Sequence, residues 1–263
     1  MEQWIPYLPN WLLIFCRITA FLMAAPVFST RGVPSQWKIG VSAIIAFIAF
    51  SAVGLKEPMA LDGMFVFSII REVLIGILLG LTAYMFFTAV QIAGAFIDIQ
   101  MGLGIANVID PMTGAQSPLI GNFKFVLAML LFLTFNGHHY LIDGFMKSYQ
   151  WLPLSNDLFA RIADGSVHEF VLRSFTTVFT LALQMSAPLV VALFLTDVGL
   201  GILSKTAPQF NIFVIGVPLK IIIGFLLLVM LLPSFLYLFQ DLFGSLFEAM
   251  NRLVQLLGTR PGS

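Results

Sequence analysis

Apolar positions along this chain gather in long runs with few charges, separated by short polar stretches. The runs are Trp11–Phe28, Ile39–Leu55, Val73–Ile97, Ser174–Thr196 and Ile221–Gln240, with a shorter one at Phe123–Phe135. As helices, the charge-free runs of 17 to 25 residues would be about 26 to 37 Å long, close to the thickness of a bilayer's hydrocarbon core. The pattern predicts an all-α chain of five or six apolar helices arranged as helical hairpins.

One segment, Gln100–Gly121, is apolar but cannot form a regular helix. It holds four glycines and two prolines in 22 positions, and both residue types break helices. Lipid cannot satisfy the N–H and C=O groups of an irregular backbone, so such a segment needs a protein cavity or a lumen. We therefore interpret Gln100–Gly121 as a candidate plug.

The second half of the chain predicts a helical hairpin with a polar tip. Its two apolar runs are joined by Asp197–Lys220, which contains the breakers Gly199, Gly201, Pro208, Gly216 and Pro218. Asp241–Gly258 has the alternation of apolar and polar positions expected of a separate amphipathic helix. Asn136–Glu169 is the most polar region and is the expected connection between the two halves.

Two glycines in the longest apolar run predict close helix packing. Gly76 and Gly80 are spaced as GxxxG, which places both on one face of a helix and leaves room for a neighbouring backbone.

Composition supports the membrane interpretation. The chain is 59% hydrophobic, has 10% charged residues and a mean hydropathy of +0.99, whereas soluble domains average about 25% charged residues. Basic and acidic residues number thirteen each, so no net charge favours a nucleic-acid partner. The single cysteine, Cys16, excludes an internal disulfide and a cysteine-based metal cluster.

No catalytic motif is complete. His168-Glu169 begins like a zinc-protease HExxH, but Leu172 stands where the second histidine is required. His138 and His139 are adjacent, and adjacent positions on a helix point about 100° apart, so we interpret them as an ordinary hydrogen-bonding pair. The sequence predicts a protein that is not an enzyme and has no cofactor or metal site.

Several charges lie within or beside apolar runs, above all Arg17, Arg71, Glu72 and Asp98. Two interpretations remain open: they pair within the protein or anchor it at the membrane interface, or some pair with neighbouring subunits or couple ions. Basic residues are scattered over nearly every turn, so the positive-inside rule assigns no orientation.

A series of short motifs runs along nearly the whole chain in a fixed order. It comprises Arg17 with Ala25-Pro26, the Arg31–Pro34 turn, Arg71-Glu72 with Gly76 and Gly80, Asp98–Gly104, Asp110-Pro111, Asn136-Gly137-His138, and Asp197–Lys220 with Lys205, Ala207-Pro208-Gln209 and Gly216-Val217-Pro218. This series resembles the FliR family, the export-gate proteins of flagellar type III secretion.

The resemblance implies a function and a set of partners. Residues 1–263 would form one export-gate subunit: 1–135 similar to a FliP-type subunit, 136–169 a polar connection, and 170–263 a FliQ-type hairpin with the amphipathic helix. The chain would close a ring with FliP-type and FliQ-type subunits, contact a FlhB-type subunit and membrane lipid, and bind no nucleic acid. The ring would gate the passage of unfolded flagellar proteins across the bacterial inner membrane at the flagellar basal body.

The resemblance also assigns residues to two sites. The plug, or gate loop, would comprise Gly102, Gly104, Ile105, Asn107, Val108, Ile109, Asp110, Pro111, Met112 and Gly114. The cytoplasm-side hairpin tip would comprise Asp197, Gly199, Gly201, Lys205, Pro208, Gln209 and Lys220. Lys205 stands where the family favours arginine, which keeps the charge but loses a bidentate donor.

An alternative from another functional class remains open. The chain could be an ion-coupled multi-helix secondary transporter, with Gln100–Gly121 as a broken helix around a small substrate.

Overall fold

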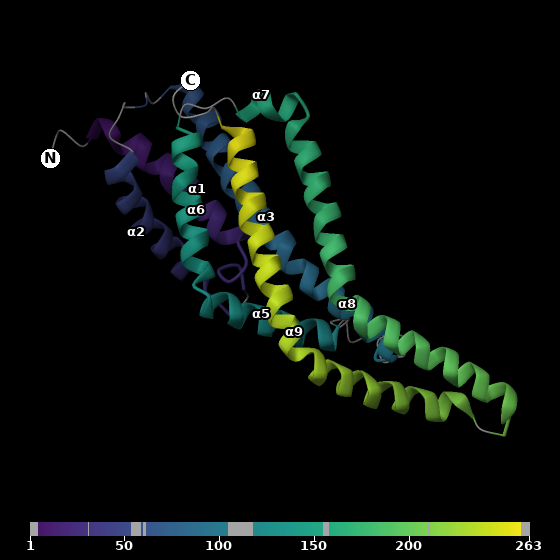
Figure 1. Cartoon of the computed structure of the whole chain (residues 1–263). Coiled ribbons are helices and arrows are strands. Elements are labelled where there is room, and N and C mark those ends of the chain that lie inside the picture. Colours follow the sequence, from purple (N-terminus) through teal and green to yellow (C-terminus); the bar gives the residue numbers. More distant parts are fainter. Residues whose placement is uncertain are drawn as a thin grey trace. The chain divides into compact units, whose positions relative to one another are not determined.

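The computed structural model describes residues 5–30, 32–53, 59, 62–104, 118–154, 158–209 and 211–258. Over these ranges the regular elements are all helices, in the order η1 (Ile5–Tyr7), α1 (Leu8–Ala24), α2 (Ser35–Val53), α3 (Gly63–Met101), α5 (Leu119–Thr134), α6 (Gly137–Trp151), α7 (Leu158–Ala163), α8 (Ser166–Thr206) and α9 (Ile212–Leu257) (Figure 1). The all-α prediction is confirmed.

Four described helices, α2, α3, α8 and α9, are long and apolar enough to cross a membrane, and the number is five if α5 and α6 count as one span. The chain is thus a multi-pass membrane protein. The first apolar run forms the 17-residue α1, an apolar helix that is just short of the length of a span. That helix ends at Ala24, shortly before Pro26.

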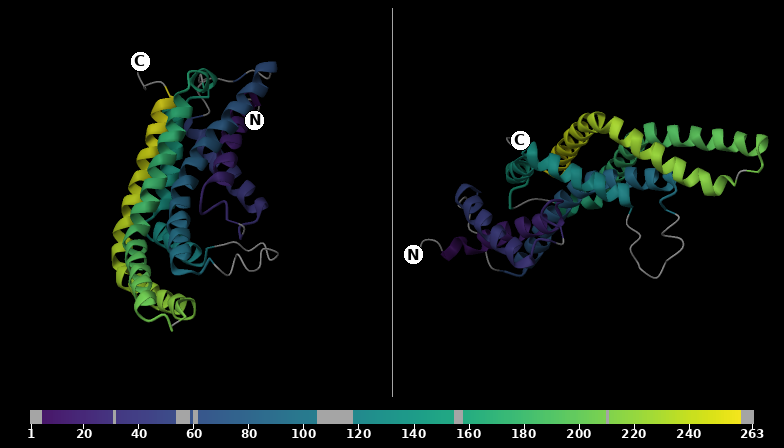
Figure 2. Two further views of the ribbon diagram at one scale, coloured as in Figure 1. Left: turned by 90° about the vertical axis from the view of Figure 1, so that its right-hand side faces the viewer. Right: turned by 90° about the horizontal axis from the view of Figure 1, so that it is seen from below.

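The chain forms two compact units, each built from separate stretches of sequence. Unit 1 comprises Met1–Met85, Phe135–Phe175 and Gly244–Ser263, and unit 2 comprises Phe86–Thr134 and Thr176–Phe243. Helices α3, α8 and α9 each contribute one part to either unit. In unit 2, α8 and the first part of α9 run antiparallel beside one another (Figure 2), so the predicted hairpin is present.

Unit 1 packs α1 directly onto α3 through the predicted glycines. A Cβ on Gly76 would collide with the Arg17 backbone oxygen and lie 2.8 Å from the Ala20 Cβ, and a Cβ on Gly80 would lie 2.6 Å from the Ala24 Cβ. Real Cβ atoms do not come this close, so only glycine permits the observed spacing. The GxxxG prediction is confirmed.

Unit 2 has its own close contact, between α3 and α5. A Cβ on Gly94 would overlap the Gly121 Cα, so these helices meet backbone to backbone. Beyond this contact the core is aromatic. The Phe87 ring lies 5.1 Å from that of Phe132 and 5.8 Å from that of Phe243, a spacing typical of favourable ring pairs.

The breaks predicted at Gly199, Gly201 and Pro218 are absent. Helix α8 continues through Gly199 and Gly201 to Thr206, and α9 contains Pro218, so the interruption between them covers only residues 207–211. The predicted separate amphipathic helix is simply the last part of α9. A glycine costs a helix only about 1 kcal/mol, and neighbouring groups in membrane proteins compensate for the N–H that proline lacks.

Candidate functional site

The plug residues predicted from sequence divide into two groups. Gly102 and Gly104 are described, whereas Ile105, Asn107, Val108, Ile109, Asp110, Pro111, Met112 and Gly114 lie outside the described residues. The site is therefore built from the two ends of this segment, Asp98–Gly104 and Pro118–Gly121, which we call the neck.

The first side of the neck is the end of α3. The Gly102 N–H donates to the Ile99 carbonyl at 3.1 Å, and the Leu103 N–H donates to the Asp98 carbonyl at 3.0 Å. Gly102 has a φ of +84°, a left-handed conformation that favours glycine. Together these features form a Schellman motif, which satisfies the last carbonyls of the helix and turns the chain away.

The second side of the neck is the start of α5, and Asp98 binds it. Both oxygens of its carboxylate accept the Ile120 N–H at 3.1 Å, and Oδ2 accepts the Gly121 N–H at 3.4 Å. The first N–H groups of a helix have no partner inside it and attract a negative charge. Asp98 is only 4% exposed. One buried carboxylate thus holds the two ends of the segment together.

A second cluster lies at the hairpin. The Lys220 Nζ contacts Asp197 Oδ1 at 2.9 Å and donates to Oδ2 at 3.0 Å, while the Gln100 Nε2 donates to Oδ2 at 2.8 Å. The Asp197 side chain is 40% exposed and that of Lys220 is 15% exposed. Asp197 and Lys220, both predicted as tip residues, are thus brought together at the base of the tip.

The other predicted tip residues do not join this cluster. Lys205 is exposed in the last turn of α8, and Pro208 and Gln209 are exposed beyond it. A Cβ added to Gly199 or Gly201 would meet open space. These residues form an outward-facing end of the hairpin.

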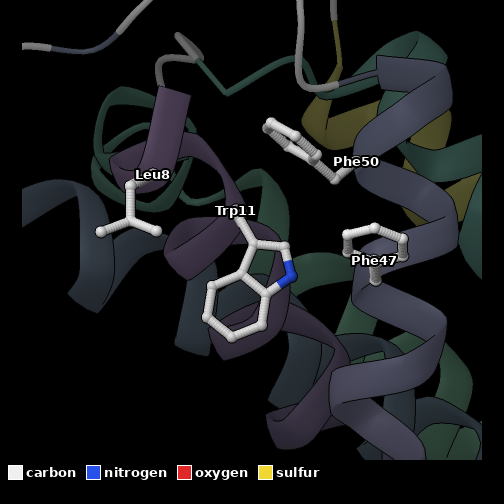
Figure 3. Close-up of a pocket in the computed structure, with 4 residues that line it drawn as sticks. All are labelled: Leu8, Trp11, Phe47 and Phe50. Carbon is white, nitrogen blue, oxygen red and sulfur yellow. The ribbon is translucent and has the colours of Figure 1, made fainter. Parts of the chain in front are cut away.

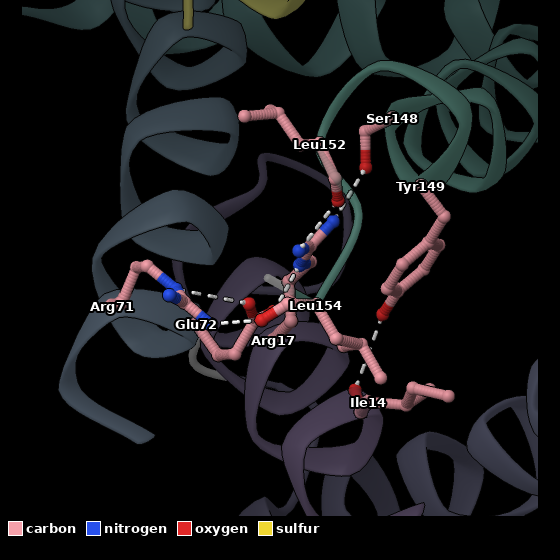
Figure 4. A network of polar contacts seen from close by, with 8 residues as sticks. All are labelled: Ile14, Arg17, Arg71, Glu72, Ser148, Tyr149, Leu152 and Leu154. Carbon is pink, nitrogen blue, oxygen red and sulfur yellow. Dashed lines mark hydrogen bonds and ion pairs between the residues drawn. The ribbon is translucent and has the colours of Figure 1, made fainter. Parts of the chain in front are cut away.

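The charges predicted in the N-terminal half form a buried network in unit 1 (Figure 4). Arg17 and Glu72 form a hydrogen-bonded ion pair in which neither side chain is exposed. The other end of the Arg17 guanidinium donates to the Leu152 carbonyl at 3.0 Å and to Ser148 Oγ at 3.4 Å. Its carbon lies 4.2 Å from the centroid of the Tyr149 ring.

Two further residues extend this network. Arg71 donates to the Leu154 carbonyl and lies 3.8 Å from Glu72 Oε1. The Tyr149 hydroxyl donates to the Ile14 carbonyl at 3.4 Å. The network therefore ties α1, α3 and α6 together, and the interpretation as intra-protein pairs is confirmed for Arg17, Arg71 and Glu72.

Two polar residues in unit 2 were not among the site residues predicted from sequence. Gln100 was assigned no role outside the plug, although it bonds to a residue 97 positions away. Lys124 of α5 is 1% exposed, and its Nζ lies 4.0 Å from the centroid of the Phe235 ring, with no hydrogen-bond acceptor among the described residues. The signal for Lys124 was a single charge in an otherwise apolar run.

The described pocket in unit 1 offers no catalytic chemistry. It has a volume of about 380 Å³ and is lined by Leu8 and Trp11 of α1 and by Phe47 and Phe50 of α2 (Figure 3). Within the described ranges, no three His, Cys, Asp or Glu side chains lie close enough to hold a metal ion. The ring centroids of His138 and His139 are 4.1 Å apart, so these side chains lean together although consecutive helical positions diverge.

Comparisons with known proteins agree along the chain. The family of bacterial export proteins, family 1, matches residues 8–246. The chain is 43% identical over 258 residues to the flagellar biosynthetic protein FliR of Bacillus subtilis (strain 168), covering 98% of this chain and 99% of that protein. It is 32% identical over 262 residues to FliR of Escherichia coli (strain K12), covering 97% of both. This chain belongs to the FliR family, and its role is in the flagellar protein export apparatus.

Proposed function

We propose that the chain is a non-enzymatic subunit of the flagellar type III export channel, where it gates the passage of unfolded flagellar proteins across the inner membrane. The observation that carries this proposal is the neck. Asp98 binds both ends of an apolar, glycine-rich segment, so that segment leaves and re-enters the helical body at one fixed point. This is the arrangement expected of a plug that projects from a rigid support.

The proposed plug works through its apolar side chains. Ile105, Val108, Ile109 and Met112 would narrow the lumen and disfavour water and ions. Methionine adapts its shape and suits a seal that must re-form around different chains. The glycines give the backbone the freedom to move aside for a passing substrate.

The proposed partners are FliP-type, FliQ-type and FlhB-type subunits. Residues 1–135 would take the place of a FliP-type subunit and residues 170–263 that of a FliQ-type hairpin, so one chain would close the ring in the inner membrane at the basal body. The hairpin supports this, because it exposes large apolar side chains, including Phe194, Leu195, Ile202, Ile222, Val229 and Met230, at 58 to 69%. Such a surface requires lipid or other subunits to cover it.

The test of the plug is to remove its apolar residues without changing its length. Replacing residues 105–112 by glycine and serine should let ions and small molecules leak through cells that carry the assembled complex, while copurification of the partner subunits stays as in the wild type. As the matched control, the same exchange at residues 206–209, of which 206, 208 and 209 are exposed, should leave leakage unchanged. An assembled plug variant that leaks no more than the wild type would contradict the assignment.

An ion-coupled secondary transporter is the second candidate, and one observation favours it. The half-exposed Asp197 beside Lys220 has the character of a coupling site in apolar helices. Purification of the chain with and without the partner subunits decides between the transporter and the gate subunit. A transporter stays folded alone or as a small homo-oligomer, whereas the gate subunit copurifies with unrelated small membrane proteins and loses stability without them.

A further inference from the structure

We infer that Gln100 couples the hairpin of unit 2 to the neck of the plug segment, so that the state of Asp197 sets how firmly the neck is held. One consequence of this inference, that a loosened neck lets ions leak, rests on the proposed plug function. The coupling itself follows from contacts among described residues of unit 2.

The last turn of α3 is held from two sides. Asp98 faces α5 and accepts its first N–H groups, and Gln100 bonds to Asp197 of α8. Residues two positions apart on a helix point about 200° apart, so these side chains reach opposite neighbours. The turn that ends at Gly102 is therefore fixed between α5 and the hairpin.

A third contact seats the same turn on α9. A Cβ on Gly224 would lie 2.6 Å from the Met101 Cε and 2.9 Å from its Sδ. The glycine thus makes room for Met101, the last residue of α3. Asp98, Gln100 and Met101 therefore attach this turn to three different helices, α5, α8 and α9.

Gln100 is the adjustable member of this set. A carboxylate only accepts hydrogen bonds, so the Gln100 amide must present its NH₂ group to Asp197. The same Asp197 oxygen also accepts from Lys220. Because the Asp197 side chain is 40% exposed, a cationic side chain of a neighbouring subunit can reach this carboxylate and take it from Gln100. The buried Asp98 offers no such access.

This gives the cluster a defined role. When Asp197 holds Gln100, the end of α3 is clamped and the neck is firm. Asp197 Oδ2 holds Lys220 and Gln100 at once, so a partner's lysine or arginine releases Gln100 only when it takes the place of the Gln100 amide on this carboxylate. The turn then keeps only its contacts to α5 and Gly224. Gln100 is a positioning residue, since it acts on the neck through the α3 backbone.

The experiment compares substitutions in the purified, assembled complex. Gln100→Leu removes the donor, and Asp197→Leu removes the acceptor. Lys220→Met leaves the Gln100–Asp197 bond in place. Ile99→Ala, at a neighbouring side chain that is 69% exposed, is the matched control. The readout is hydrogen–deuterium exchange of the peptide that contains Ile120 and Gly121, whose N–H groups bind Asp98.

The expected result is exchange about tenfold faster in Gln100→Leu and Asp197→Leu, the size for loss of a hydrogen bond to a charged group. Lys220→Met and Ile99→Ala should exchange as the wild type does. Unchanged exchange in both leucine variants overturns the coupling, whatever their leakage. Faster exchange without leakage supports the coupling and contradicts the plug function, so the two proposals fail separately.

Discussion

Two charge clusters in this protein use the same chemistry in different surroundings. Arg17 and Glu72 of unit 1 have side chains with no exposed surface, whereas Asp197 and Lys220 of unit 2 are 40% and 15% exposed. In the first cluster every donor of Arg17 must find its acceptor inside the chain. In the second, water or another subunit can serve as partner.

The difference in burial gives the two clusters different roles: the buried one stabilises the fold, and the exposed one can change its partners. A buried ion pair resists loss of one member, because the remaining charge is left in a medium of low dielectric at a cost of about 3–5 kcal/mol. An exposed pair contributes about 0–1 kcal/mol and exchanges partners readily. The Arg17 network therefore fixes the packing of α1, α3 and α6, and the Asp197 cluster is suited to a contact that changes.

Lys124 is a third case and tests this distinction. It is as buried as Arg17, but among described residues it has only the Phe235 ring beneath its Nζ. A cation over an aromatic face gains about 0.5–2 kcal/mol, less than the several kcal/mol that removing an ammonium from water costs. Burial of a charge is thus not by itself a sign that the charge stabilises the fold.

The largest effect is expected from breaking the buried pair. Arg17→Met keeps the apolar stem and leaves Glu72 with only the more distant Arg71 as a cationic partner, so the complex should lose up to about 3–5 kcal/mol of stability. Thermal unfolding of the purified complex and its yield from membranes measure the change.

The control for this prediction is the double variant Arg17→Met/Glu72→Met, which removes both charges and should recover most of the loss. Arg252→Met, which breaks an exposed pair with Glu248 on α9, should change stability by less than about 1 kcal/mol. A double variant as unstable as the single one would show that the ion pair itself, and not the orphaned carboxylate, carries the stability.

A gain is expected at Lys124. Lys124→Met removes a buried ammonium that has no hydrogen-bond acceptor in the described part of the chain and places a thioether against Phe235, a contact that is itself favourable. The complex should become more stable by about 1 kcal/mol or more, measured by the same unfolding transition. Lys147→Met, at a side chain that is 60% exposed, is the control and should be nearly neutral. A destabilised Lys124→Met variant would show that the ammonium is needed where it lies.

Local patterns were enough to predict much of the fold. The order of the helices follows from apolar runs, and the α1–α3 contact follows from Gly76 and Gly80, because both features depend on neighbouring positions in the sequence. The predicted breaks at Gly199, Gly201 and Pro218 were wrong for the same reason. Local propensity favours a break there, and the packing that keeps the helix intact is not local.

Pairings between distant residues could not be predicted. Arg17 and Glu72 are 55 positions apart, and Gln100 and Asp197 are 97 apart. The sequence marked Arg17, Glu72, Asp98 and Asp197 as unusual charges, but only the fold assigns each its partner. Gln100, an uncharged residue at the end of α3, gave no signal of its own.

The smallest change in stability is expected from replacing Lys205, although this replacement should lower export. The side chain is exposed in the last turn of α8, where a basic group interacts favourably with the helix dipole by about 0.3–1 kcal/mol. Lys205→Glu should therefore leave the core complex assembled. If the proposed FlhB-type partner binds the tip, the reversed charge should weaken that contact and lower the amount of flagellar protein secreted into the medium. Lys205→Arg keeps the charge and should export normally. If Lys205→Glu exports as much protein as the wild type, Lys205 is not part of a partner-binding surface at the tip. Asp197 would then be the charged group of the hairpin that is proposed to bind a partner.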